Sequence, residues 1–256
     1  MNEIIQIENL DFDYPDRKGV LKNINLKIMD GEDVAVIGKN GAGKSTLLLH
    51  MIGILNGNGV IRIFGKGLKK ENLYEIRKRI GFVFQNPDDQ LFMPTVFDDI
   101  SFGPLNFGFS KEETKKRVGE VLKIVGLDNY ALRKPHHLSM GEKKRAAIAT
   151  VLVLEPEVII FDEPTLSLDP NGRKNLIAFI RRLKSTKIIA THDLEMALEI
   201  CKRVILMENG KIIVDGEINK ILGNQKLMNE IGMEVPMSLK MRRFSINKSG
   251  EKDGIQ

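Results

Sequence analysis

The stretch that decides the fold of this chain is Gly38-Lys39-Asn40-Gly41-Ala42-Gly43-Lys44-Ser45. It matches the pattern G-x-x-x-x-G-K-[ST] at every fixed position. The apolar run 34–37 precedes it, and residues 46–49 continue it with helical spacing. This order predicts a strand, a glycine-rich loop and a helix, which is the context that the motif requires. The alternative is a glycine-rich turn that contains Lys-Ser by coincidence.

The motif predicts a site for the phosphates of a nucleoside triphosphate. Glycines let the backbone approach phosphate oxygens, because no Cβ stands in the way. Successive N–H groups then point at the anion, at the start of a helix. Lys44 is expected to reach the β- and γ-phosphates, and the Ser45 hydroxyl to bind Mg²⁺. The predicted ATP-binding residues in and after the loop are Gly38, Asn40, Gly41, Gly43, Lys44, Ser45 and Thr46.

The composition is that of an ordinary globular protein. The chain has 256 residues, of which 42% are hydrophobic and 29% charged, enough for one large α/β domain or a domain with a small appendage. The net charge of +5 is spread along the chain, and we interpret it as solvated surface charge. A single cysteine, Cys201, excludes an intrachain disulfide. The longest apolar run, 146–154, is about half of the ~20 residues that a membrane span needs, and we expect no signal peptide.

Alternation and helical spacing predict the secondary elements. Alternating residues indicate strands with one buried face at 4–14, 24–28 and 60–64, with a turn at 15–19 between the first two. Ser139 and Glu142 have the spacing of a capping box and begin a predicted helix over 139–154. The remaining predicted helices are 73–80, 111–125, 170–183 and 194–201, and the remaining strands are 81–84, 158–161, 187–190 and a hairpin at 204–214. One or two short helices are predicted within 217–231, followed by a polar tail from about 249.

Polar side chains follow several of the predicted parallel strands. They are Gln85, Asp162, Glu163 and His192. Because ligands of open parallel sheets bind outside the carboxyl ends of the strands, we expect these residues to converge on the glycine-rich loop. Asp162 suits Mg²⁺, and Glu163 is placed to deprotonate an attacking water. Gln85 is a candidate ligand of metal or water, and His192 a candidate donor to the γ-phosphate; for both, a satisfied residue at the sheet rim is the alternative.

Two further segments complete a known set of motifs. Residues 138–145, L-S-M-G-E-K-K-R, are similar to the signature L-S-G-G-Q-x-x-R, and residues 158–165 resemble a Walker B segment with its catalytic glutamate. On these motifs the chain resembles, over about residues 3–225, the nucleotide-binding subunits of ATP-binding-cassette transporters. The resemblance makes Asp169 part of the D-loop, His192 the switch histidine, Gln85 the Q-loop residue and Tyr14 the residue that stacks on adenine. By position alone, packing is an equal alternative for Tyr14.

The signature departs from the family pattern at two places. Met140 replaces its first glycine, and Glu142 replaces its glutamine. The Ser139 hydroxyl and the Gly141 amide remain, so we expect contact with phosphate to survive. Met140 is expected to narrow the approach of the phosphate to the signature, and Glu142 is expected to add a negative charge near the site.

The resemblance implies a fold and a mechanism. The fold is α/β: a P-loop NTPase (RecA-like) core with a mainly parallel sheet, an N-terminal antiparallel β subdomain and an inserted helical subdomain. The expected limits are 1–225 for the ATPase domain, about 86–154 for the insertion and 226–256 for a C-terminal extension. Two subunits would enclose two ATP molecules, with Leu138, Ser139, Met140, Gly141 and Glu142 of one capping the loop of the other. The implied cofactor is Mg²⁺, held at Ser45, Gln85 and Asp162, and the implied location is the cytoplasmic face of a membrane.

The stretch 85–92, Q-N-P-D-D-Q-L-F, resembles energy-coupling-factor importers, especially the cobalt/nickel type. This implies an integral membrane partner docked near residues 85–93, although burial of 91–93 in the core is the alternative. The cobalt/nickel type also implies pairing of the chain with itself, whereas vitamin-type importers often use two different subunits. The histidines, Cys201 and the methionines over 228–241 lack metal-ligand spacing, so we expect the membrane partners to handle the metal. We interpret those methionines as core residues or a dimer contact.

Other functions fit less of the sequence. An importer of a vitamin or another small solute is the first alternative. A soluble ATP-binding-cassette protein acting on nucleic acid or ribosomes is the second, but the chain lacks the long coiled coil, the zinc cysteines and the second cassette of such proteins. A P-loop kinase or switch GTPase would lack the signature. No nucleic-acid partner is expected.

Overall fold

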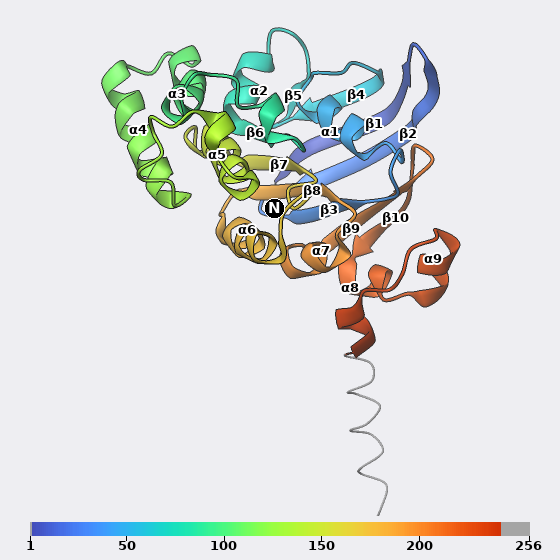
Figure 1. The fold of residues 1–256 in the computed structure, drawn as a ribbon. Coiled ribbons are helices and arrows are strands. Elements are labelled where there is room, and N and C mark those ends of the chain that lie inside the picture. The colour runs from blue at the N-terminus through green and yellow to red at the C-terminus, as the bar shows by residue number, and fades with distance from the viewer. Residues whose placement is uncertain (1, 242–256) are drawn as a thin grey trace, which may run out of the picture.

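A six-stranded sheet occupies the centre of the computed structural model, which describes residues 2–241 (Figure 1). Its strand order is β10-β9-β3-β8-β7-β6, and all neighbours are parallel except β10, which pairs antiparallel with β9. The strands are β3 (Asp33–Ile37), β6 (Ile80–Val83), β7 (Val158–Asp162), β8 (Thr186–Thr191), β9 (Arg203–Glu208) and β10 (Lys211–Glu217). Every residue of β7 and β8 is buried, as their continuous apolar runs predict. The mainly parallel core predicted from the sequence is confirmed.

The N-terminal part forms a second, antiparallel sheet of order β2-β1-β4-β5. Its strands are β1 (Glu3–Tyr14), β2 (Arg17–Met29), β4 (Asn58–Ile63) and β5 (Lys66–Gly67). The prediction for β2 was too short, and the predicted turn at 15–19 was too long, since β2 already begins at Arg17. The alternation breaks at Asn23, which has a left-handed φ of 49°, and the pairing of β1 with β2 shifts register there. The irregularity concealed the first half of the strand.

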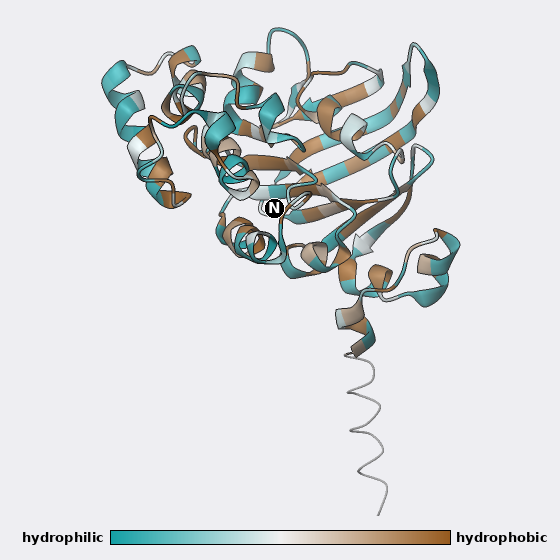
Figure 2. Ribbon diagram, in the orientation of Figure 1, coloured by the Kyte–Doolittle hydropathy of each residue, from teal (hydrophilic) through white to brown (hydrophobic). Residues whose placement is uncertain are grey.

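Helix α1 (Lys44–Met51) lies between the two sheets. Its buried residues Leu47, Leu48 and Met51 share one apolar cluster with residues from both sheets. On the other face of the large sheet, four helices cover a second cluster (Figure 1). They are α6 (Pro170–Arg182), α7 (Leu194–Ile200), α8 (Ile218–Leu222) and α9 (Gln225–Glu230). Figure 2 shows the resulting contrast between the hydrophobic strands of the large sheet and the mixed surfaces of the helices.

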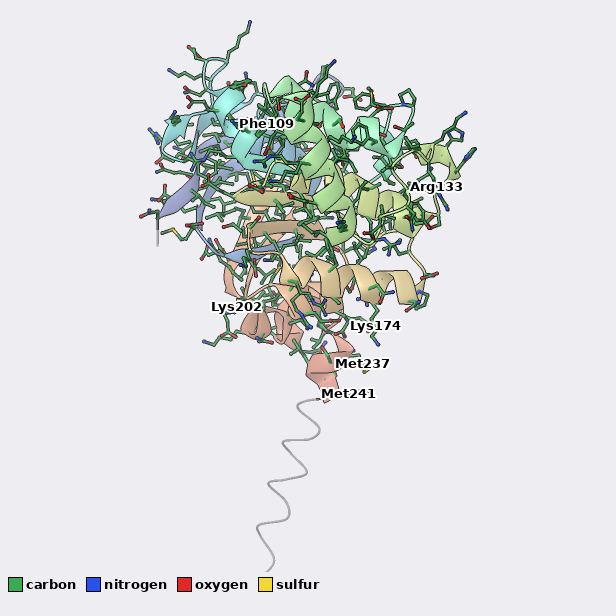
Figure 3. The ribbon with its side chains drawn as sticks, turned by 90° about the vertical axis from the view of Figure 1, so that its left-hand side faces the viewer. Phe109, Arg133, Lys174, Lys202, Met237 and Met241 are labelled. Atoms are coloured by element: carbon green, nitrogen blue, oxygen red, sulfur yellow. The ribbon has the colours of Figure 1, made fainter. Side chains whose placement is uncertain are left out.

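The chain between β6 and β7 is helical and has an apolar cluster of its own. It contains α3 (Val96–Asn106), α4 (Lys111–Ile124), α5 (Met140–Leu152) and the 3-10 turns η1 (Pro87–Asp89) and η2 (Pro135–His137). The predicted capping box of α5 is confirmed, with Ser139 as N-cap. These helices reach α2 (Leu73–Arg79) at Phe109, whose ring lies 5.3 Å from the Lys78 ammonium. Figure 3 shows Phe109 beside α2 and Arg133 on the opposite side of this helical region.

The domain limits at 1–225, 86–154 and 226–256 remain predictions, and residues 242–256, with the predicted polar tail, lie outside the described residues. The methionines of the C-terminal part differ in burial: the core role predicted for them holds for Met228, and the dimer contact stays a prediction. Met228 is fully buried in the core, whereas Met237 and Met241 are exposed near the end of the described chain (Figure 3). Within residues 2–241, no helix has both the length and the apolar character to cross a membrane.

Candidate active site

The glycine-rich loop wraps around the Lys44 side chain. A Cβ at Gly38 would collide with the backbone carbonyl of Met207 on β9, so this position requires glycine. The Lys44 ammonium donates to the carbonyl oxygen of Gly38 at 2.8 Å and to that of Lys39 at 3.4 Å. It also lies 3.7 Å from Oε1 of Glu163. The charge of a side chain that is only 6% exposed is therefore held at the centre of the loop.

Asp162 ends β7 behind the start of α1. Its carboxylate is hydrogen-bonded by Ser45, and burial raises its pKa. Within residues 2–241, its Oδ1 atom is buried and has no hydrogen-bond partner. A buried carboxylate oxygen without a partner is costly unless a ligand satisfies it. A serine hydroxyl beside a carboxylate is also the donor set that Mg²⁺ takes, so the residues present fit this ion.

Glu163 follows directly and is held by several donors. Its backbone adopts a left-handed φ of 44°, and its N–H donates to the carbonyl of Ala190 on β8 at 2.8 Å. Its Oε2 atom accepts from the Thr191 hydroxyl and the His192 N–H, both at 3.2 Å, and lies 2.8 Å from Nδ1 of His192. The carboxylate is 8% exposed. A backbone strained in this way and a fully engaged carboxylate are expected where a reacting group must keep one position.

These groups surround one cavity of about 300 Å³, the nucleotide cavity. It is lined by Tyr14, Arg17, Val20, Asn40, Gly41, Gly43, Lys44, Ser45, Thr46, Gln85, Glu163, Leu166 and His192. The structure thus brings together predicted residues from five separate parts of the sequence: Tyr14, residues 40–46, Gln85, Glu163 and His192. Gly38 and Asp162 are outside the lining and contact it from behind, through Lys44 and Ser45.

Tyr14 lies at the mouth of the nucleotide cavity. Its hydroxyl is 3.5 Å from that of Thr46, and its ring packs edge-to-face on Phe12 with centroids 4.8 Å apart. Tyr14 therefore packs on Phe12 and also lines the nucleotide cavity, so the two roles predicted for it do not exclude each other. Sequence reasoning missed Arg17, which donates to the carbonyl of Gly41 at 3.0 Å. Its position three residues after Tyr14, across a short turn, is the signal that could have identified it.

The signature residues line a different cavity, of about 750 Å³, the signature cavity. Ser139, Met140, Gly141 and Glu142 contribute from the start of α5, and Asp169 from the start of α6. Among the described residues, none lines both cavities. Leu138 points inward, is 6% exposed and belongs to the core of the helical region. A single copy of the chain therefore keeps its signature apart from its own glycine-rich loop.

Glu142 is bound by its neighbours within the signature cavity. Its Oε2 atom accepts from the Ser139 N–H at 2.8 Å and from the Ser139 hydroxyl at 2.9 Å. The Tyr130 hydroxyl donates to Oε1 at 2.7 Å. The bonds from Tyr130 and from the Ser139 backbone lower the pKa of the Glu142 carboxyl. The negative charge expected here is present, and three donors compensate it.

Residues 91–93 differ in burial, and docking of a membrane partner near them stays a prediction. Leu91 is buried in the core of the helical region, whereas Phe92 is 63% exposed. Met93 lines an apolar groove of about 490 Å³ beside α3 and the start of α4. The other apolar residues of this groove are Phe97, Phe102 and Leu105.

The histidines and Cys201 were considered as metal ligands. In the part of the chain that the structure describes, no three His, Cys, Asp or Glu side chains are grouped so as to hold a metal ion. Cys201 is buried, which raises the pKa of its thiol.

Comparisons with known proteins give a consistent result. A family model described as ABC transporter matches residues 21–166. The energy-coupling factor transporter ATP-binding protein EcfA of Carboxydothermus hydrogenoformans is 44% identical over 245 residues, covering 94% of this chain and 90% of that protein. The structure of cbiO1 from Clostridium perfringens, described as part of the ABC transporter complex cbiONQ, matches with a TM-score of 0.79 at 36% identity, over 95% of this chain and 100% of that one. A dimeric ATP-binding cassette in a post-hydrolysis state, bound to ADP and Pi, matches with a TM-score of 0.75 at 29% identity, over 84% and 99%.

Proposed function

The chain belongs to the ABC transporter family and is an ATP-hydrolysing subunit of a transporter, and we propose that this transporter is an energy-coupling-factor importer of cobalt or nickel ions. The cargo proposal is supported by the stretch 85–92, which resembles the cobalt/nickel type. The similarity to EcfA and to cbiO1 supports the energy-coupling-factor class. The transported ion is cargo of the membrane partners, and the chain itself would lie on the cytoplasmic face of the membrane.

The observation that carries the catalytic proposal is the position of Glu163. It shares the nucleotide cavity with Lys44 and Ser45, and His192 holds its carboxylate. In the proposed reaction Lys44 leaves Glu163 and binds the β- and γ-phosphates. Glu163 then accepts a proton from the attacking water, while His192 fixes the orientation of the carboxylate. Ser45, Asp162 and Gln85 would hold Mg²⁺, which neutralises charge on the phosphate oxygens when bound.

The second part of the proposal is that two copies form the complete site. Among the described residues, none from α5 lines the nucleotide cavity, and the start of α5 lines the signature cavity instead. Helix N-termini bind anions through their unpaired N–H groups. The signature of one copy would cap the nucleotide of the other. The match to a dimeric cassette bound to ADP and Pi supports this arrangement.

The apolar groove beside α3 is the proposed docking site for the membrane partner. Its residues Phe102 and Leu105 are 46% and 47% exposed, and neighbouring Phe92 extends the apolar surface. Exposed apolar patches of this kind mark interaction sites. A helix from the partner, with apolar side chains spaced for a groove, is the ligand that fits.

The catalytic proposal is tested with Glu163→Gln. Loss of the base should slow hydrolysis by about 10²–10⁴-fold, since that is the range for general-base catalysis. ATP should still bind, and a stable ATP-bound dimer should accumulate. Size-exclusion chromatography with light scattering measures the dimer. The matched control is Glu157→Gln. Glu157 is a surface residue directly before the first residue of β7, and its carboxylate pairs with Arg79. Unaltered turnover in Glu163→Gln would refute the assignment of Glu163 as base.

The transporter proposal is tested by co-purification. A tagged chain should capture an integral membrane protein, and the complex should bind Co²⁺ or Ni²⁺ in amounts measured by elemental analysis. Leu105→Asp in the groove should abolish capture, because a charge there must be desolvated on docking. Ile54→Asp, at an equally exposed apolar residue elsewhere, is the control. Capture of a membrane protein without either metal would favour another solute, and capture of nucleic acid would contradict the proposal.

A further inference from the structure

The structure contains a lysine in an environment that lysines rarely occupy. Lys144 lies in the second turn of α5, two residues after Glu142 of the signature, and is 1% exposed. It ranks first by volume among the fully buried side chains. Removing an ammonium group from water costs several kcal/mol by order of magnitude unless donors and charges are satisfied, so this burial must be compensated.

The Lys144 ammonium donates hydrogen bonds to two backbone carbonyl oxygens. One belongs to Gln85, two residues after the last residue of β6, and the other, at 3.5 Å, belongs to Glu163, directly after β7. Because β6 and β7 are neighbouring parallel strands, their carboxyl ends lie side by side. A single side chain from the signature helix thus joins the two strand ends that carry the candidate Q-loop residue and the candidate base.

The charges around Lys144 support the same contact. Asp162 and Glu163 favour its charged form, while burial lowers the pKa of its ammonium to about 8. On the other side of the site, the Lys44 ammonium lies 3.7 Å from Glu163. The two acids are therefore balanced by one lysine from the glycine-rich loop and one from the signature helix.

Other side chains tie α5 to the segment after β6, but they end there. Gln90 donates to the carbonyl of Ala147 at 2.9 Å and to the Thr150 hydroxyl at 2.8 Å. Lys143 pairs with Asp88 at 2.7 Å. Lys144 is the member of this group that also reaches the end of β7, and so contacts the residue that reacts.

We propose that Lys144 is a positioning residue that couples the signature to the catalytic strand ends, by holding the backbones of Gln85 and Glu163 to α5. The proposal rests on the proposed ATPase function. A force on the start of α5, when Ser139 and Gly141 engage the nucleotide of a second copy, acts through Lys144 on both backbones. ATP binding to the glycine-rich loop of one copy does not use this contact, whereas the hydrolytic step does.

The test compares Lys144→Met, which keeps the length and loses the donors, with Lys144→Arg, which keeps charge and donors. In full-length protein, Lys144→Met should lower kcat by about tenfold or more, the effect of losing hydrogen bonds from a charged group. The Kd of a fluorescent, non-hydrolysable ATP analogue should change by less than about threefold, because Lys144 is not among the residues that line the nucleotide cavity. Lys144→Arg should recover most of kcat. Lys143→Met, one residue away and also tied to the segment after β6, should keep kcat near that of the wild type.

Several outcomes would overturn the proposal. It fails if folded Lys144→Met has a wild-type kcat, if kcat and nucleotide affinity fall together, or if Lys144→Arg is no better than Lys144→Met. If Lys144→Met does not fold, Lys144→Gln replaces it. Glutamine keeps one neutral donor group, so the expected kcat is below that of Lys144→Arg but above zero. A wild-type value for Lys144→Gln would then overturn the proposal. Absence of hydrolysis in the wild-type chain would instead refute the ATPase function, so the two failures are distinguishable.

Discussion

The nucleotide cavity and the signature cavity are built in different ways. The nucleotide cavity lies at the carboxyl ends of parallel strands, and its Lys44 and Glu163 side chains are buried and paired with each other across a long sequence separation. The signature cavity lies at the starts of two helices, and its polar groups are paired locally. Ser139 and Glu142 bind each other within one turn, and Asp169 caps α6 through Gly172.

This difference explains what each cavity can bind. The nucleotide cavity offers a lysine, a serine hydroxyl and an acid pair, and is able to hold phosphates and a metal ion by itself. The signature cavity offers a helix N-terminus. Among the described residues that line it, none belongs to the glycine-rich loop that carries Lys44. The two cavities of one copy share no residue among those described, which supports the proposal that the signature caps a nucleotide of another copy. The comparison predicts that changes in the two cavities affect different steps.

The largest effect on ATP binding is expected in the nucleotide cavity, from Lys44→Met. This change removes a charge-assisted contact with the phosphates, and the Kd for ATP should rise by about 10–100-fold. Titration calorimetry measures it. Lys39→Met is the matched control in the same loop, because the Lys39 ammonium lies beside Gly232 and outside the cavity lining. Equal losses in both variants would mean that net loop charge, rather than the position of Lys44, binds the nucleotide.

A smaller effect on binding, but a clear one on turnover, is expected from Ser139→Ala. A single copy should bind ATP normally, while turnover falls by about tenfold because a donor to the phosphate of the second copy is lost.

Mixing the two variants sharpens this comparison. A dimer of one Lys44→Met copy and one Ser139→Ala copy contains one complete site, so an equal mixture should regain about a quarter of wild-type turnover if half of the dimers are mixed. The assay is ATP hydrolysis after co-refolding or co-expression of two differently tagged chains. No gain over the separate variants would contradict a site shared between copies.

The smallest effect is expected from Glu142→Gln. Glutamine keeps one acceptor oxygen for the Ser139 donors, and its amide N–H can donate to the Tyr130 hydroxyl oxygen, so turnover at neutral pH should change by less than about threefold. The difference should depend on pH. Since the folded state lowers the pKa of Glu142 below its usual 4.5, the charged carboxylate stabilises the fold above that value, and this contribution is lost as pH falls through the lowered pKa. Thermal unfolding of both proteins between neutral and acidic pH measures this; parallel curves would show that the charge contributes nothing.

The sequence predicted the nucleotide cavity better than its surroundings. Tyr14, Gln85, Lys44, Glu163 and His192 do line one cavity, because polar residues after parallel strands share one rim of the sheet. Arg17 was missed, since the irregular half of β2 hides the strand that carries it. The interpretation of the net charge as solvated surface charge does not hold for Lys144, which is buried although a lysine in an amphipathic helix is usually solvated.

What the sequence determined by itself is local: the strand, loop and helix around Gly38–Ser45, the capping box at Ser139 and the buried run of β7. Each follows from the spacing of residues that are close along the chain. Only the tertiary structure decided that Glu163 meets Lys44 and His192, that the signature stands apart from its own loop, and that Lys144 is buried between β6 and β7. These depend on the strand order β3-β8-β7-β6, which is set by the packing of distant segments into one core and leaves no short-range pattern in the sequence.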